Sequence, residues 1–478
     1  MSTANPAAPA SLSFPTKLSY GLGSIAFGIK DHGFNTLLML YYNQVIGLPA
    51  SWVGLAIMLA MLVDAVADPL IGHWSDGVKS AWGRRHPFMY ASAIPVAVAY
   101  FLLWMPPAGS NELLFAHLLI VSIIVRTAIS CYEIPSAALL SEFSSRYEER
   151  TSLSTFRTLF FAIGTLVMAV LVFKVMLVPT PEYPTGQLNP AGYLRYASVA
   201  AVVMVLAILI STAGTHHRIP SLRAISIERG DGGSLLSGLR VLVTDRTYVS
   251  VLLCVFLFAV ATGVATTLGV YISTYFWRLS ANDIGTVAGG AGGGLLLALI
   301  VLHFARRFSK KRVAVSLYSV ALLAGASPVL LGLAGLMPQS ITTLLPCLIV
   351  CYLLMTTGVF AALVVSQSMV ADVADHIELK TGRRMEGLMF AAMIMTSKAV
   401  SGVGVFLSGA ILSGIGFPEK ADPATVDPAV VTQLAQIFVV SLTVFVILAL
   451  IALSFYPITR EIHEKTLRQL AERTKATT

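Results

Sequence analysis

Residues 51–73 read SWVGLAIMLAMLVDAVADPLIGH, and this stretch decides the class of fold. It is longer than the roughly twenty apolar residues with which an α-helix crosses about 30 Å of hydrocarbon. Two carboxylates, Asp64 and Asp68, interrupt it four residues apart, so a helix places both on one face. Acids kept inside a membrane helix are costly, which indicates a polar interior with a function.

The rest of the chain repeats this apolar character. Of the 478 residues, 56% are hydrophobic and only 12% are charged, about half the charge of a soluble protein. We therefore predict an all-α polytopic membrane protein. A window of about nineteen residues predicts twelve transmembrane helices, at 18–43, 51–73, 87–105, 113–140, 152–178, 193–213, 248–277, 281–305, 313–335, 342–371, 385–415 and 430–456.

Lysine and arginine are concentrated in alternate connections between these spans. The basic connections contain Lys17, Lys79, Arg84, Arg85, Arg146, Arg150, the stretches 218–246 and 306–312, Lys380, Arg383, Arg384 and the tail 460–475. The other connections hold little more than Arg278 and Lys420. Because basic loops remain in the cytoplasm, we expect both termini there, in a bacterial inner membrane. We therefore attribute the net charge of +8 to the basic cytoplasmic loops rather than to nucleic-acid binding.

One long polar connection, at 215–247, divides the spans six and six. We predict a cytoplasmic tail at 1–17, a six-helix bundle at 18–214, a cytoplasmic linker at 215–247, a second six-helix bundle at 248–456 and a cytoplasmic tail at 457–478. Two bundles of this kind rock about a site near the membrane midplane in major facilitator transporters.

The sequence contains no pattern typical of an enzyme or a metalloprotein. The four cysteines lie in apolar stretches, where we expect no disulfide. The nine histidines are scattered, without metal-ligand spacing or a nucleophile–base arrangement. We predict a transporter that needs no cofactor.

The paired acids of the second span are candidates for a cation site. Like charges one turn apart are stable in a membrane only if a proton, a metal cation or a basic group neutralises them, and oxygen ligands suit Na⁺ or a proton. We interpret Asp64 and Asp68 as the coupling-ion site. The alternative is that one aspartate forms a structural salt bridge across the bundle while Asp68 caps a turn before Pro69.

Other spans also contain charges. Glu133 precedes Ile134-Pro135, and a proline within a helix leaves backbone groups without their helical hydrogen bonds. We expect Glu133 to pair with Arg157, either as a structural contact or as part of a binding site. Lys398 stands in the apolar eleventh span and needs a carboxylate from the other half, which makes it a candidate sensor between the halves. Arg126 and Lys174 receive no role here.

Two loops repeat a pattern of acids followed by Gly-Arg-Arg. They are HWSDGVKSAWGRRHP after the second span and DVADHIELKTGRRMEG after the tenth. We predict that their charged residues form a conformational latch rather than a substrate site: Asp76, Arg84, Arg85, Asp372, Asp375, Arg383 and Arg384.

Along almost its whole length the chain resembles the glycoside-pentoside-hexuronide:cation symporter family, the branch of the major facilitator superfamily that includes melibiose permeases. The matching motifs are GIKDHGF at 28–34, VDAVADPLIGHWSD at 63–76, GRRHP at 83–87, YEIP at 132–135 and DVADHIELKTGRRMEG at 372–387. The resemblance implies the major facilitator fold, with twelve transmembrane helices in two six-helix bundles.

The resemblance also implies roles for individual residues. Four positions correspond to the family's cation site: Asp64, Asp68, Ser130 and Glu133. Five match its substrate site: Lys30, Asp31, Glu133, Arg157 and Lys398, the last being the lysine that communicates between cation and substrate. In three places the chain departs from melibiose permeases: Ala137 replaces an aromatic residue, Ile394 replaces a polar one, and Glu133 replaces an aspartate.

We therefore expect Na⁺- or H⁺-coupled symport of a sugar or glycoside by alternating access, by a monomer in the lipid bilayer that binds no nucleic acid. The alternative is cation-coupled transport of a lysolipid-like or other amphiphilic substrate, for which the missing aromatic residue leaves room. A membrane-bound enzyme or receptor would need a soluble domain, and the longest extramembrane stretch is too short to bury a core.

Overall fold

The structure, a computed structural model, describes residues 12–143, 147–219, 242, 244–305, 307–382 and 386–477, and the regular elements in these ranges are helices. The first half comprises α1 (Phe14–Leu22), α2 (Ser24–His32), η1 (Gly33–Leu37), α3 (Leu38–Leu40), η2 (Tyr41–Ile46), α4 (Ala50–Gly77), α5 (His86–Leu103), α6 (Asn111–Phe143), α7 (Tyr147–Leu171), η3 (Val172–Met176), η4 (Gly186–Leu188) and α8 (Pro190–His216). The second comprises α11 (Arg246–Tyr271), η5 (Ile272–Phe276), α12 (Ala281–Ala305), α13 (Lys310–Leu333), α14 (Ile341–Thr381), α15 (Glu386–Gly414), α16 (Pro428–Ser454) and α17 (Arg460–Thr477).

Within the described residues, ten helices are long and apolar enough to cross a membrane. The two other predicted spans are helical as well: the first is divided among α1, α2, η1, α3 and η2, and the eleventh is α15. Many large apolar side chains lie on the surface of the protein, which is the arrangement expected where lipid is the solvent. The predicted all-helical class is therefore confirmed.

Local sequence sets several helix ends. Asp245 caps α11 by accepting hydrogen bonds from the N–H groups of Thr247 and Tyr248. Asp427 caps α16 in the same way, accepting from Ala429, and Pro428 follows at the first helical position. These caps satisfy backbone donors that a helix start leaves without an intrahelical partner.

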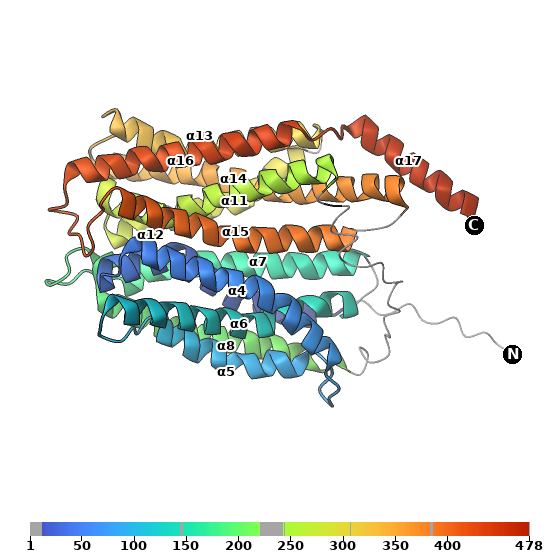
Figure 1. Cartoon of the computed structure of the whole chain (residues 1–478), viewed down its shortest axis with the longest axis horizontal. Coiled ribbons are helices and arrows are strands. Elements are labelled where there is room, and N and C mark those ends of the chain that lie inside the picture. Colours follow the sequence, from blue (N-terminus) through green and yellow to red (C-terminus); the bar gives the residue numbers. More distant parts are fainter. Residues whose placement is uncertain are drawn as a thin grey trace. The chain divides into compact units, whose positions relative to one another are not determined.

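The helices cluster into two compact units. The first unit contains Leu62–Ala169 and the chain before Asn35, with α8. The second contains Asn35–Met61 and Val170–Pro190 from the first half of the sequence, together with α11 to α17. In the second unit, α14 packs against α12 and α13, and α16 packs against α11 and α13 (Figure 1). The domain boundaries predicted from the sequence remain a prediction.

Glycines bring α12 close to α14 in the second unit. A Cβ at Gly294 would lie 2.7 Å from the carbonyl oxygen of Leu353, and Thr357 Oγ1 donates to the Gly294 carbonyl oxygen at 3.2 Å. Small residues allow such close approach between membrane helices, where lipid supplies no hydrophobic drive for association.

The turns after η2 and η5 are built alike. Gly47, directly after η2, and Arg278, which follows η5 after one further residue, both have left-handed backbone, with φ 96° and φ 50°. The next residue donates its N–H back to the π-helix, from Leu48 to the Tyr42 carbonyl and from Leu279 to the Ser273 carbonyl. Two similar turns in the two halves of the chain support the internal repeat of a major facilitator fold.

A polar cluster in the second unit joins the first-half segment Asn35–Met61 to the second half. We call Asn43, Gln44, Tyr271, Tyr275 and Ala421 the outer cluster, because the charge pattern predicts that their end of the helices faces outward. Gln44 Oε1 accepts from Tyr275 Oη at 2.8 Å and from the Ala421 N–H at 2.9 Å, and Asn43 Oδ1 accepts from Tyr271 Oη at 3.0 Å. All five residues are buried.

Candidate cation and substrate site

The candidate site is built around Asp64 in α4. Its Oδ2 accepts a hydrogen bond from Arg126 Nη2 at 2.7 Å, and its Oδ1 accepts from Ser130 Oγ at 3.0 Å. The side chains of Asp64 and Arg126 are 5% and 4% exposed. Arg126 and Ser130 are one turn apart on α6, so one face of α6 presents both donors to α4.

Asp68 follows one turn after Asp64 in α4, as the sequence predicts, and is half-buried. It interacts electrostatically with the thiol of Cys131 on α6. Pro69 lies inside α4, and its missing N–H leaves the carbonyl one turn earlier without its helical hydrogen bond. Both aspartates therefore face α6 beside a weakened stretch of helix, which suits a site that must bind and release a cation.

Lys30 and Asp31 lie on α2 beside this pair. Lys30 is buried and its Nζ lies 4.0 Å from Asp31 Oδ1, whereas the Asp31 side chain is 37% exposed. The Lys30 ammonium also lies 4.2 Å from the Phe27 ring centroid and interacts electrostatically with Asp64, Arg126 and Glu133. The residues predicted separately for substrate and cation thus form one charged cluster.

Two glycines, Gly28 on α2 and Gly33 at the start of η1, allow this segment to lie close to its neighbours. A Cβ at Gly28 would come within 2.4 Å of the Phe161 carbonyl oxygen on α7, and one at Gly33 within 2.0 Å of Tyr100 Oη on α5. The first contact is with backbone and would force the helices apart, whereas the second would displace the Tyr100 hydroxyl from its hydrogen bonds with the Ile29 carbonyl oxygen and Tyr196 Oη. The glycines of the GIKDHGF motif therefore position Lys30 and Asp31.

Arg157 on α7 donates a hydrogen bond to Tyr20 Oη at 3.3 Å, and its guanidinium lies 5.7 Å from the Tyr20 ring centroid. Tyr20 in turn donates to the Ser136 carbonyl oxygen on α6 at 2.8 Å. Glu133 lies within electrostatic range of Arg157. In this structure the hydrogen-bond partner of Arg157 is Tyr20, so a direct Glu133–Arg157 pair remains a prediction for another conformational state.

Seven charged side chains of α2, α4, α6 and α7 form this cluster. The carboxylates are Asp31, Asp64, Asp68 and Glu133, and the bases are Lys30, Arg126 and Arg157. When all seven are ionised, the cluster has a net charge of one negative unit. One monovalent cation balances the cluster. Isolated charges are expensive in a membrane, so this balance favours binding of a single cation.

Sequence reasoning missed Arg126, to which it gave no role. The structure corrects this, because the guanidinium directly contacts the carboxylate predicted to bind the cation. The alternative interpretation of Asp64 and Asp68 allowed a salt bridge from one aspartate to a basic residue across the bundle, but the sequence did not indicate which base would form it. Lys174, the other residue without a role, lies exposed in η3. Lys398 is in α15, but its side chain lies outside the described residues, so its predicted role is untested.

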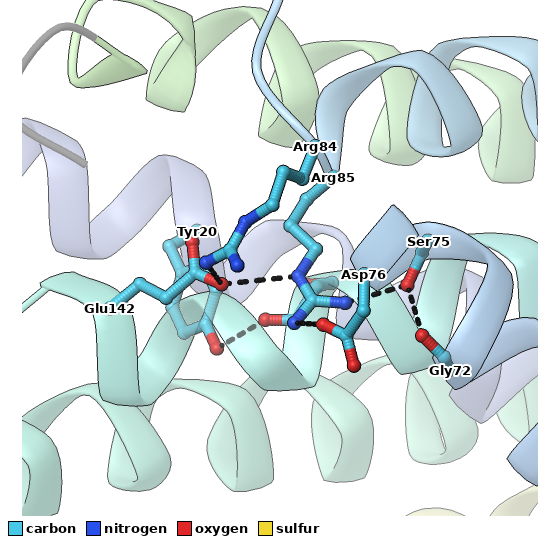
Figure 2. A network of polar contacts seen from close by, with 8 residues as sticks. Tyr20, Gly72, Ser75, Asp76, Arg84, Arg85 and Glu142 are labelled. Carbon is cyan, nitrogen blue, oxygen red and sulfur yellow. Dashed lines mark hydrogen bonds and ion pairs between the residues drawn. The ribbon is translucent and has the colours of Figure 1, made fainter. Parts of the chain in front are cut away.

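The residues of the predicted latch that follow the second span form a compact ionic network within the first unit (Figure 2). Arg85 contacts Asp76 Oδ1 at 2.5 Å and Glu142 Oε1 at 3.1 Å, and it donates to Ser75 Oγ at 2.6 Å. Arg84 reaches the same Glu142 oxygen at 3.0 Å. Glu142, which is buried at the end of α6, was missed because it lies far along the chain from this loop.

The residues of the predicted latch that follow the tenth span are described in part. Asp372 on α14 contacts Lys310 Nζ at 2.6 Å and His463 Nε2 at 3.5 Å. Asp375 is half-buried on the same helix, whereas Arg383 and Arg384 lie outside the described residues. Lys310 and His463 are partners that the sequence analysis did not assign.

Helices of membrane-spanning length, with many large apolar side chains on their surfaces, define a polytopic membrane protein among the residues that the structure describes. The chain belongs to the MFS/sugar transport protein family, whose model matches residues 19–460. It is 26% identical to an uncharacterized symporter of Synechocystis over 97% of both chains. It is also 26% identical to the isoprimeverose transporter of Lactiplantibacillus pentosus, over 84% of this chain and 80% of that protein.

Solved structures agree on the fold. A crystal structure of a D-xylose-proton symporter superposes with a TM-score of 0.62 at 13% identity, covering 93% of this chain and 98% of that one. The chain therefore has the major facilitator fold, and it is a transporter rather than an enzyme.

Proposed function

We propose that this protein couples the uptake of a sugar or glycoside to the movement of one monovalent cation, Na⁺ or H⁺, by alternating access. The observation that carries the proposal is the charged cluster around Asp64, which has one more carboxylate than bases and in which Lys30, Asp64 and Arg126 are buried. The family description and the isoprimeverose transporter among its relatives support a sugar as substrate.

The roles proposed within the cluster follow from position and charge. Asp64, Asp68, Ser130 and Glu133 supply oxygen ligands to the cation. The more exposed Asp31, with Lys30 and Arg157, offers hydrogen-bond partners to sugar hydroxyls. Lys30 interacts electrostatically with Asp64 and Glu133. A change of charge at these cation ligands therefore changes the electrostatic environment of Lys30, a proposed sugar ligand.

The coupling has sufficient driving force. At about 100 mV, an entering monovalent cation supplies about 2.3 kcal/mol, and a tenfold cation gradient adds about 1.4 kcal/mol. The total of about 3.7 kcal/mol supports accumulation of several hundred-fold at one-to-one stoichiometry. We propose that the protein is a monomer in a bacterial inner membrane. Because the basic residues are concentrated in alternate loops, we place both termini in the cytoplasm.

The outer cluster supports a conformation that is closed at the predicted outer end. There, segments of the first half are hydrogen-bonded to the second half within one compact unit. Alternating access requires these bonds to break when the site opens outward.

The test is uptake by proteoliposomes that contain the purified protein. A panel of radiolabelled pentosides, hexosides and hexuronides, together with a lysolipid, is offered with an inward Na⁺ gradient, an inward proton gradient or no gradient. Gradient-driven accumulation of a glycoside supports the proposal. Accumulation of the lysolipid alone would favour the amphiphile alternative, and gradient-independent equilibration of every substrate would refute coupling.

A further inference from the structure

The contact between Arg126 and Asp64 places a resident positive charge on a proposed cation ligand. The distance from Arg126 Nη2 to Asp64 Oδ2 is 2.7 Å, and both side chains are buried. Ser130 Oγ holds the other Asp64 oxygen at 3.0 Å. Both oxygens of the carboxylate are thus engaged, and the guanidinium repels a second positive charge beside it, so a cation that binds Asp64 competes with Arg126.

The guanidinium is held incompletely. It carries five N–H donors, but Arg126 Nε is buried without a hydrogen-bond partner among the described residues. Its carbon lies 5.5 Å from the Phe34 ring centroid, a contact that attracts a cation but accepts no conventional hydrogen bond. A buried ion pair repays its desolvation only when its remaining donors are satisfied. The pair is therefore suited to exchange rather than to permanent structural support.

The surrounding charges make this exchange consequential. With all seven groups ionised, the cluster has one more negative than positive charge, and without Arg126 it would have two more. Lys30 on α2 interacts electrostatically with both members of the pair and with Asp31 and Glu133, and Glu133 on α6 in turn interacts with Arg157 on α7. Asp68 lies one turn after Asp64 on α4. Arg126 is the base of this set that contacts Asp64 directly.

We propose that Arg126 is an internal competitor for the coupling cation. Its guanidinium neutralises Asp64 while the cation site is empty, and it leaves Asp64 when Na⁺ or a proton takes its place. The inference rests on the proposed function, because it requires Asp64 to bind the coupling cation. In this role Arg126 weakens cation binding and assists cation release, since it occupies the vacated carboxylate and avoids an uncompensated buried charge.

The experiment measures cation binding directly, without transport. Wild-type protein, Arg126→Gln, Arg126→Lys and the control Arg195→Gln are purified in detergent; Arg195 is an exposed arginine on α8. Binding of radioactive Na⁺ is measured at alkaline pH. Protonation of buried carboxylates is followed in Na⁺-free buffer by infrared difference spectroscopy across a pH titration.

Arg126→Gln is expected to bind Na⁺ at least tenfold more tightly than wild type or, if the proton is the coupling ion, to keep its carboxylate protonated at least about one pH unit higher. Arg126→Lys should fall between the two, because an ammonium keeps the charge but loses the fixed guanidinium geometry. Arg195→Gln should match wild type.

A folded Arg126→Gln protein with unchanged or weaker cation binding would overturn the proposal. If that variant does not fold, Arg126→Lys decides, and cation binding equal to or weaker than wild type would overturn it. Failure of the proposed function looks different: wild type would then show no cation effect on glycoside uptake. If no cation bound to any folded variant, both ideas would fall.

Discussion

Replacing Gln44 with leucine should open the predicted outer end. Leucine keeps most of the volume but removes the acceptor that binds Tyr275 Oη at 2.8 Å and the Ala421 N–H at 2.9 Å, and the donor that reaches the Pro418 carbonyl oxygen at 3.0 Å. Tyr275 keeps a second bond, to the Ala421 carbonyl oxygen at 3.1 Å, whereas the buried Ala421 N–H loses its partner.

The magnitude follows from these contacts. An unsatisfied buried group costs about 1–3 kcal/mol, and each further lost hydrogen bond costs about 1 kcal/mol. The closed arrangement should therefore lose at least about 3 kcal/mol. In an outward-open state the same groups face water, so the substitution costs little there, and the equilibrium between the two states should shift about 100-fold toward opening.

Labelling of a buried position at this end measures the shift. Thr267 is fully buried on α11 and donates to the Asn35 carbonyl oxygen at 3.0 Å. With the native cysteines replaced, Thr267→Cys should react with a membrane-impermeant maleimide, added outside intact cells, at least tenfold faster in the Gln44→Leu background. The matched control is Gln433→Leu, because Gln433 is exposed on α16. Equal labelling rates with and without Gln44→Leu, or the same increase with Gln433→Leu, would refute the reasoning.

Asp64→Asn or Asp68→Asn should abolish gradient-driven accumulation more severely than substrate exchange, because exchange needs alternating access but no cation gradient; well-expressed variants with full cation-dependent accumulation would contradict the assignment. Neutralising either Glu133 or Arg157 should reduce binding or expression more than neutralising both; a double variant no better than either single one removes support for their pairing. Glu142→Gln should destabilise the protein by about 3 kcal/mol, since a buried carboxylate shared by two guanidinium groups loses its charge. An unchanged thermal unfolding midpoint in detergent would contradict that.

Much of the fold could be predicted because its determinants are local. Apolar length identifies a membrane helix, and the four-residue spacing of Asp64 and Asp68 fixes their common face in any helix. The structure keeps both aspartates on α4, facing α6. The glycines beside Lys30 were quoted only as part of a motif, because sequence alone does not show which helix approaches them.

The charged loop after the second span shows what cannot be predicted from neighbouring residues in the sequence. Asp76, Arg84 and Arg85 could be recognised as a charged loop, but the buried acceptor shared by both arginines is Glu142, at the end of a helix far along the chain (Figure 2). The loop has more bases than acids, which was the available signal that another acid was needed. Which acid it is depends on the packing of α6.

By itself, the sequence determined that this protein lies in a membrane, that it is helical, and which carboxylates lie within its spans. These properties depend on hydrophobicity and helical spacing, which act over one or two turns. Only the tertiary structure decided that Arg126 faces Asp64, since an arginine on one span can meet an acid on any neighbouring span. The cost of a buried charge demands a partner, and the packing of α4 against α6 selects it.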